Sequence, residues 1–291
     1  MKVNRYVKDF NLQQIFDCGQ CFRWEREADG SYTGIAFGKP VNISLEETAS
    51  LEGMLTVDNT TESDFEMIWH PYLDLGRDYG PIKHTLAQSD AVMADVIRSG
   101  SGIRILNQDK WETVVSFLIS QNSNIPRIKR CIETLACMFG TEAGEYAGRT
   151  FYELPAPEVL ATLTVSDLEP VKLGYRAAYL IETAKAVAAD DGEILARTGD
   201  MPFEEAYTYL TGLHGIGPKV AHCILLFSMG KTESFPIDVW IRRVMHHLYG
   251  FAERDAAGIR SFAAETFGGY GGIAQQYLFY YMRDREGKNF Q

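Results

Sequence analysis

The spacing of apolar residues changes once along this chain, and that change limits the folds open to it. Up to about residue 60, β-forming residues cluster or alternate in short runs bounded by turn residues, at 21–27, 31–38, 39–47 and 52–59. From about residue 62 to the C-terminal end, apolar residues recur at helical spacing. We therefore expect an α+β protein in which an N-terminal antiparallel β-sheet domain, residues 1–90, packs on a mainly α-helical body, residues 91–291.

The net charge of -11 over 291 residues argues against a general polyanion binder, because phosphate contacts need lysine and arginine. The excess of acidic residues is smaller after residue 98, so a local basic patch remains open there. No apolar run is long enough to cross a membrane, and the first residues lack the apolar core of a signal peptide. With five cysteines expected to stay reduced, we expect a cytoplasmic monomer, associated with the nucleoid in a prokaryote, that contacts no membrane.

A glycine-rich stretch within residues 205–230 predicts two helices joined by a tight hairpin. Gly212, Gly215 and Gly217 allow positive φ and leave backbone N–H groups uncovered, and Pro218 suits the first turn of the second helix. Exposed amides at a helix start bind anions, and a phosphate is the natural guest. An ordinary turn between helices explains the glycines equally well.

Two charged residues near this hairpin suggest chemistry. Lys219 falls in the first turn of the second helix, where the helix dipole opposes a cation and favours loss of the proton that a nucleophilic amine must lose. Asp238 follows nineteen residues later, just before another apolar helix. Taken singly, Lys219 is a solvated lysine and Asp238 is an N-cap, so each has a structural explanation as well.

These residues resemble the helix-hairpin-helix DNA glycosylase superfamily, and within it the 8-oxoguanine DNA glycosylases, which also have lyase activity. The resemblance extends over nearly the whole chain in the family's order of motifs: CGQCFRW, GIRILNQDKWETVVSFLISQNSNIPRI, LGYRAAYL, LHGIGPKVAHC with PIDV, and IAQQYLF. It implies that Lys219 attacks C1′ of the damaged nucleotide to form a Schiff base and that Asp238 stabilises the transition state. The implied partner is double-stranded DNA containing oxidised guanine, and no cofactor is implied.

The same resemblance implies a slot for a flipped base. Phe279 and Cys223 would sandwich the ring, the Gly19 carbonyl would accept the N7–H that oxidation adds, and Gln275 would read the Watson–Crick edge. The sequence spacing agrees, because Gln275 and Phe279 are four apart, as are Lys219 and Cys223. Each of these residues alone could instead be core, surface amide or bulge glycine.

Further positions are implied to contact the DNA backbone and the opposite base. The orphaned cytosine would be held by Asn122, Arg127 and Arg176, with Tyr175 as the wedge. A phosphate 3′ of the lesion would meet the backbone amides of Gly215, Gly217 and Val220. A monovalent cation could sit on hairpin carbonyls, here those of Thr211, Leu213 and Ile216.

Some positions depart from the family's pattern. Trp240 stands where members often have a phosphate-contacting histidine, and Phe227 stands where eukaryotic members tend to have methionine. Cys18 and Cys21 form a C-x-x-C with no second pair, so we expect no metal, and the four-cysteine iron–sulfur signature of sister enzymes is missing from the sequence. The alternatives are a lysine-free sister glycosylase for alkylated bases, a non-catalytic DNA-binding module, and a purely structural role for every motif.

Overall fold

The N-terminal sheet has five antiparallel strands in the order β1-β5-β4-β3-β2. The computed structural model describes the backbone of residues 1–289 and the side chains of residues 1–283. The strands are β1 (Lys2–Lys8), β2 (Trp24–Arg26), β3 (Tyr32–Ala36), β4 (Lys39–Ala49) and β5 (Glu52–Asp58). The last four form the expected meander, whereas β1 was not predicted and pairs along its whole length with β5, from Lys2 opposite Asp58 to Lys8 opposite Glu52.

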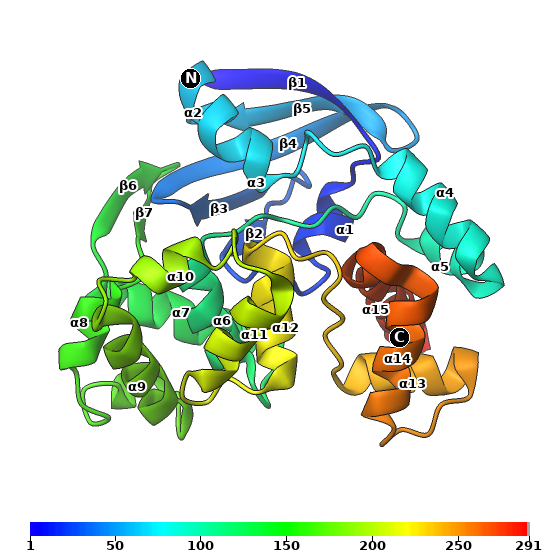
Figure 1. Ribbon diagram of the computed structural model, residues 1–291. Helices are drawn as coiled ribbons and strands as arrows, with labels where there is room; N and C mark the ends of the chain where they lie inside the picture. The colour runs from blue at the N-terminus through cyan, green and yellow to red at the C-terminus, as the bar shows by residue number, and fades with distance from the viewer. Residues whose placement is uncertain (290–291) are drawn as a thin grey trace.

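The edge-proximal strand β5 shows how the sheet buries one face. In β5, Gly53, Leu55 and Val57 are buried, and the residues between them are more exposed. The buried face packs on a separate apolar cluster that includes Phe65 and Trp69. Figure 1 shows the sheet lying across the top of the helical body, with β1 at its outer edge.

The remaining chain is helical apart from one hairpin. The helices that precede the hairpin are α1 (Leu12–Phe16), α2 (Glu62–Asp64), the π-helix η1 (Phe65–Trp69), α3 (His70–Tyr72), α4 (Tyr79–Ser89), α5 (Ala91–Ser99), α6 (Lys110–Ser120) and α7 (Ile125–Phe139). Those that follow it are α8 (Pro157–Thr162), the 3-10 helix η2 (Glu169–Val171), α9 (Arg176–Ala188), α10 (Glu193–Arg197), α11 (Phe203–Gly212), α12 (Pro218–Ser228), α13 (Val239–Tyr249), α14 (Ala256–Phe267), the 3-10 helix η3 (Gly268–Tyr270) and α15 (Gly271–Asn289).

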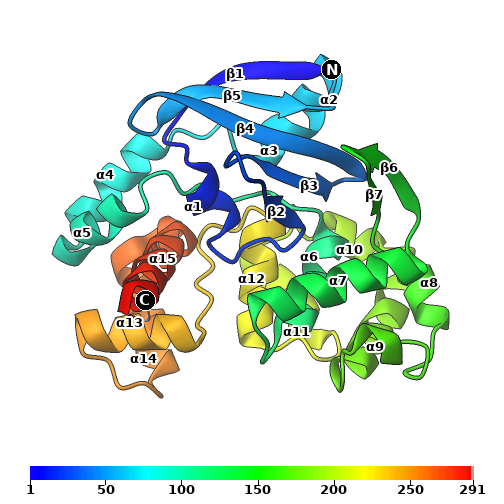
Figure 2. The ribbon, with the colours of Figure 1, turned by 180° about the vertical axis from the view of Figure 1, so that it is seen from behind.

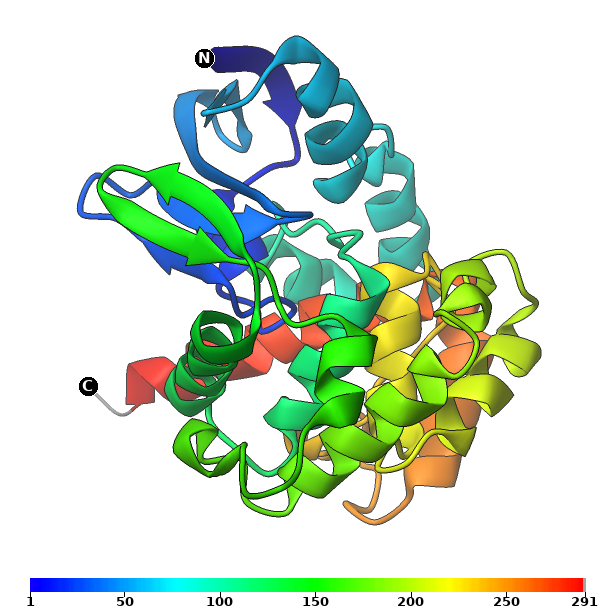
Figure 3. The same cartoon turned by 90° about the vertical axis from the view of Figure 1, so that its left-hand side faces the viewer.

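The expectation that the chain stays helical after residue 62 is wrong at this hairpin, which consists of β6 (Glu142–Tyr146) and β7 (Arg149–Tyr152). Ala147 and Gly148 both have positive φ, the combination that a two-residue hairpin turn requires. The hairpin extends toward the N-terminal sheet (Figure 3), where the Tyr146 hydroxyl donates to an Asp58 carboxylate oxygen at 3.1 Å. Tertiary packing therefore decides the conformation of this segment.

The α+β expectation is confirmed, and α12 is the central helix of the body. It packs on α6 and α11, and its buried residues are Val220, Ala221, Cys223, Ile224, Leu225, Leu226, Phe227 and Ser228. Figure 2 shows α13, α14 and α15 as a second group beside it, joined to α12 by an extended segment. No helix in residues 1–289 has the length and apolar character needed to cross a membrane.

Candidate active site

Lys219 enters the site from the start of α12. Pro218 begins this helix, so Lys219 is its second residue, as the glycine pattern predicted. Its Nζ lies 5.1 Å from the centre of the Phe117 ring on α6. The Lys219 side chain is half-buried, and the face of the Phe117 ring lies beside its amine.

Asp238 caps α13 and faces the same space. One of its carboxylate oxygens accepts the Ile241 N–H at 2.8 Å, which fixes the side chain at the helix start. Burial raises the pKa of Asp238, while the Ile241 N–H and the nearby Lys219 charge oppose that rise. The capping role and an active-site role are therefore compatible in this residue.

Both residues line a cavity of about 470 Å³, in which the predicted base-binding residues also meet. Its walls come from the loop after α1, from α6, from α12 and from α15. The cavity brings together residues from the two ends of the chain, and its lining includes Gly19, Lys219, Cys223, Asp238, Gln275 and Phe279. The size suits a single planar base with room for its sugar.

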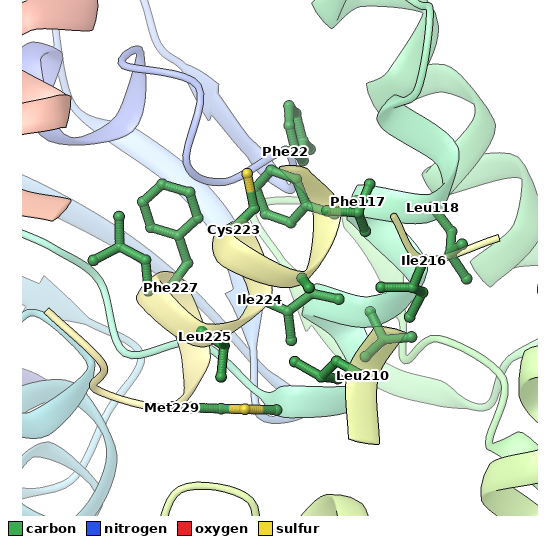
Figure 4. Close-up of a cluster of buried hydrophobic side chains, with 14 of the residues drawn as sticks. Phe22, Phe117, Leu118, Leu210, Ile216, Cys223, Ile224, Leu225, Phe227 and Met229 are labelled. Carbon is green, nitrogen blue, oxygen red and sulfur yellow. The ribbon is translucent and has the colours of Figure 1, made fainter. Parts of the chain in front are cut away.

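Gly19 and Phe279 lie close to each other in this cavity. Gly19 has φ +81°, and a methyl group at this position would lie 3.5 Å from the Phe279 ring edge. A side chain here would be strained and would meet the ring, so only glycine leaves the backbone close to a stacked base. Figure 4 shows Phe22 and Phe117 next to Cys223.

Cys223 and Gln275 are almost fully buried, each 3 % exposed. Burial raises the pKa of the Cys223 thiol to about 11, although Lys219 opposes the rise, so the thiol is neutral at physiological pH. The Gln275 carbonyl accepts a hydrogen bond from the Gln276 amide at 2.8 Å. That bond occupies the side-chain oxygen of Gln275 and leaves its NH₂ group as the end that can donate to a ligand.

A second hollow of about 650 Å³ continues from the first along the hairpin. Asn122 and Tyr175 line it together with Lys219, Asp238, Trp240 and the first residues of α12. Asn122 sits at φ +47° in the turn between α6 and α7, and Tyr175 is 51 % exposed. Two of the four predicted opposite-base residues therefore face this hollow.

The two arginines of that set lie beside the same turn but bind carbonyls. Arg176 is buried, stacks 4.6 Å from the centre of the Tyr175 ring and donates to the carbonyls of Gln121, Asn122 and Leu173. Arg127 donates to the Lys172 carbonyl at 3.1 Å. These bonds hold the α6–α7 turn against the start of α9.

The hairpin uses one of its three glycines as a positive-φ residue. Gly215 has φ +82°, and a methyl group there would approach Tyr179 to 2.5 Å, whereas Gly217 has φ -87° and Gly212 lies within α11. Neither Gly215 nor Gly217 donates its N–H to a backbone carbonyl of the described residues. These two N–H groups beside the start of α12 therefore have no backbone acceptor in the described part of the chain, and their binding of a phosphate stays a prediction.

The structure also shows the surroundings of the hairpin carbonyls and of the cysteine pair. The Leu213 carbonyl accepts the Ile216 N–H at 3.2 Å, so one of the three predicted cation ligands is already an acceptor. Cys18 and Cys21 are buried free thiols bonded to backbone carbonyls of α1. No group of three metal-ligating side chains occurs among the residues with described side chains.

Several lining residues were missed by the sequence interpretation. Arg283 is four residues beyond Phe279 on α15, so the spacing that linked Gln275 to Phe279 could have found it. Gln276 adds a buried amide whose carbonyl has no partner in the described part of the chain. Phe117 stacks on Phe227, the residue that stands where eukaryotic members tend to have methionine. Their ring centres are 5.5 Å apart, and the two rings form the apolar wall. Nothing in the sequence marks Phe117 as different from core.

Trp240 lines both hollows at the start of α13. The Arg243 guanidinium lies 5.1 Å from the centre of its ring system. An indole with an arginine against it therefore stands at the position where members of the family often have a histidine. An indole N–H and an arginine are both able to meet a phosphate.

The fold and the site together define a helix-hairpin-helix glycosylase. It has a lysine at the start of the second helix of the hairpin motif and an aspartate at the start of the helix that follows. The chain belongs to the HhH-GPD superfamily of base excision DNA repair proteins, whose model matches residues 115–267, and the 8-oxoguanine DNA glycosylase N-terminal domain matches residues 2–114.

Three relatives are similar over nearly their whole length. The chain is 30% identical to a probable N-glycosylase/DNA lyase of Methanothermobacter thermautotrophicus, over 95% of each protein. A solved 8-oxoguanine glycosylase/lyase of Clostridium acetobutylicum, bound to DNA with cytosine opposite 8-oxoguanine, is 39% identical, with 98% of each chain covered and a TM-score of 0.89. MBOgg1, solved with a low-affinity DNA ligand, is 46% identical, with 98% of this chain and 96% of that chain covered and a TM-score of 0.92.

Proposed function

We propose that this protein excises 8-oxoguanine opposite cytosine from double-stranded DNA and then cleaves the abasic strand by β-elimination. The observation that carries the proposal is one cavity that holds Lys219 and Asp238 beside Gly19, Gln275 and Phe279. The relatives that cover the whole chain carry glycosylase/lyase names, which supports the same reaction.

In the proposed reaction, the neutral Lys219 amine attacks C1′ as the bond to the base breaks. Positive charge develops on the sugar in this step, and the half-buried Asp238 carboxylate stabilises it at short range. The resulting amine adduct opens to a Schiff base, which acidifies the neighbouring sugar carbon. Loss of that proton expels the 3′ phosphate, which is the strand cleavage of a lyase.

Base selection would rest on the glycine loop and α15. The Gly19 carbonyl accepts N7–H of oxidised guanine and repels the N7 lone pair of normal guanine. Gln275, whose side-chain carbonyl accepts from the Gln276 amide, offers its NH₂ group to the carbonyl of the Watson–Crick edge. Phe279 and the neutral Cys223 thiol stack on the ring from opposite sides.

The strand contacts would lie along the second hollow. Tyr175 wedges into the gap that the flipped base leaves, and Asn122 meets the orphaned cytosine. Arg127 and Arg176 join them by exchanging bonds to the backbone of the turn for bonds to the base. The amides of Gly215, Gly217 and Val220 would hold the phosphate. The carbonyls of Thr211, Leu213 and Ile216 would hold a monovalent cation. The N-terminal sheet domain would end at residue 90.

Two rival functions differ from this one at Lys219. A glycosylase for alkylated bases that uses water as nucleophile needs Asp238 but has no use for a lysine beside it. A non-catalytic DNA-binding module keeps the hairpin amides but needs neither residue. The joint placement of Lys219 and Asp238 in one base-sized cavity favours the lysine-dependent enzyme.

The test is incubation of the protein with a duplex carrying 8-oxoguanine opposite each normal base, measuring base release and strand cleavage separately. Wild type should release the base and cleave the strand fastest opposite cytosine, and Lys219→Gln should do neither. Base release without cleavage in wild type and in Lys219→Gln would support the water-using glycosylase. Binding without either product would leave the DNA-binding module.

A further inference from the structure

The base cavity contains a charged side chain, Arg283, that has no role in the proposed function. Arg283 lines the cavity from α15, in line with Gln275 and Phe279, because each is four residues from the next. Its guanidinium carbon lies 5.7 Å from the centre of the Phe279 ring. A buried charged group costs free energy unless it meets a partner, so its presence needs an explanation.

The partners of Arg283 leave one donor group unused. Its Nη2 donates to the Asp17 carbonyl, in the turn that leads to Gly19. Its Nη1 is buried and has no hydrogen-bond partner among the described residues. A methyl group at Gly19 would lie 3.7 Å from Nη1, so the unused donor borders the backbone at which the N7 edge of the base is proposed to bind. Buried donors without a partner are rare in folded proteins.

The order of residues along α15 indicates which part of the base Nη1 meets. With the Watson–Crick edge at Gln275 and the ring over Phe279, the five-membered ring of the purine points along α15 toward Arg283. Position C8 lies at that end, next to N7, and in 8-oxoguanine it carries a carbonyl oxygen, O8. Normal guanine has only a C–H there.

We infer that Arg283 donates a hydrogen bond from Nη1 to O8 of the flipped base and stabilises the base as it leaves. This inference rests on the proposed function and adds a catalytic residue to it. When the Lys219 amine forms its bond to C1′, the electron pair of the C1′–N9 bond passes to N9 and is shared with O8 through the N9–C8 amide. The surplus proton of the new ammonium group then neutralises the departed base.

A cation at O8 acts where negative charge develops, as the donors of an oxyanion hole do. It also distinguishes the lesion from guanine in the rate of bond breaking and not only in binding, because guanine offers no oxygen at this place. The Asp17 carbonyl and the Phe279 ring hold the guanidinium in position before the base arrives.

The test separates base excision from strand cleavage. Single-turnover rates are measured for Arg283→Leu, Arg283→Lys and wild type on a duplex with 8-oxoguanine opposite cytosine, and on the same duplex with a preformed abasic site. Arg283→Leu should excise 8-oxoguanine roughly 100-fold more slowly, the scale of losing one oxyanion donor, and should cleave the abasic site at the wild-type rate. Arg283→Lys should recover part of the excision rate, because it keeps a donor cation.

The matched control is Arg98→Leu, which removes an exposed arginine of α5 that pairs with Asp95. It should leave both rates unchanged. Wild-type excision by Arg283→Leu, or an equal loss on both substrates, would overturn the role at O8. Failure of wild type to release 8-oxoguanine while it still cleaves the abasic duplex would overturn the proposed function, and the inference with it.

Discussion

Asp238 is expected to destabilise the fold that it caps. Burial raises its pKa above the ordinary value of 3.8, so the folded protein holds this proton more tightly than the unfolded chain does. At a pH above both pKa values the carboxylate is ionised in the folded and the unfolded state, and the folded state then bears the cost of keeping it charged. The substitution Asp238→Asn would keep the hydrogen bond to the Ile241 N–H without the charge, because asparagine and aspartate cap helices about equally well.

The magnitudes follow from separating the cap from the charge. Asp238→Ala loses the cap and should be less stable than Asp238→Asn by about 1 kcal/mol. Asp238→Asn should be at least as stable as wild type, while both variants lose base excision by roughly 100-fold or more because the sugar cation is no longer stabilised. Urea unfolding at neutral pH gives the stabilities, and single-turnover excision gives the rates.

Asp255 is the matched control for this pair of substitutions. It caps α14 by accepting the Gly258 N–H at 2.8 Å, and it lies outside the cavity lining. Asp255→Ala should lose about 1 kcal/mol of stability, Asp255→Asn should lose little, and both should excise normally. If Asp238→Asn proves clearly less stable than wild type, the carboxylate charge stabilises the helix start more than its burial costs, and the reasoning is refuted.

Other perturbations test the hairpin, a buried histidine and the cavity thiol. Gly215→Ala, with φ +82° and Tyr179 only 2.5 Å from the new methyl, should lose about 1–3 kcal/mol in urea unfolding and weaken DNA binding in fluorescence anisotropy; an unaltered variant would contradict the hairpin geometry. Burial lowers the pKa of His222 from 6.5 to about 4, so its share of stability is complete above pH 6.5 and falls, by up to about 3 kcal/mol, as the pH drops to about 4. The urea midpoints of wild type and His222→Gln, measured across that pH range, should converge at low pH. If the two plots of midpoint against pH stay parallel, His222 is not the source of the pH dependence. With a pKa of about 11, the Cys223 thiol should resist iodoacetamide in the folded protein near neutral pH, while exposed Cys137 reacts. Mass spectrometry of the labelled peptides checks this, and labelling of Cys223 as fast as Cys137 would contradict it.

Local patterns predicted the fold where the burial of a segment follows its own sequence. In the strands β2 to β5, β-forming residues cluster or alternate between turn residues, and the helices near the site show apolar spacing. β1 was missed because its buried Val3 and Val7 are four residues apart, a spacing that fits a helix as well as a strand. The β6–β7 hairpin was missed because none of its strand residues is fully buried, and its contacts with the sheet come from elsewhere in the chain.

The site shows the same division between local and distant contacts. Lys219 at a helix start and Asp238 as an N-cap follow from their own neighbours in sequence. The meeting of Gly19 with Phe279 depends on the packing of the first helix region on the last, which no local pattern contains, and only the family resemblance brought them together. Arg283 lies outside that resemblance, and its unused donor becomes visible only in three dimensions.

The central claim is that the Lys219 amine becomes bonded to the sugar. Borohydride is added to the protein with duplex DNA carrying 8-oxoguanine opposite cytosine, and the trapped complex is digested and mapped by mass spectrometry. The account predicts one adduct, on the peptide that contains Lys219, and none with Lys219→Gln. An adduct on another lysine, or base release with no trapped complex, would contradict it.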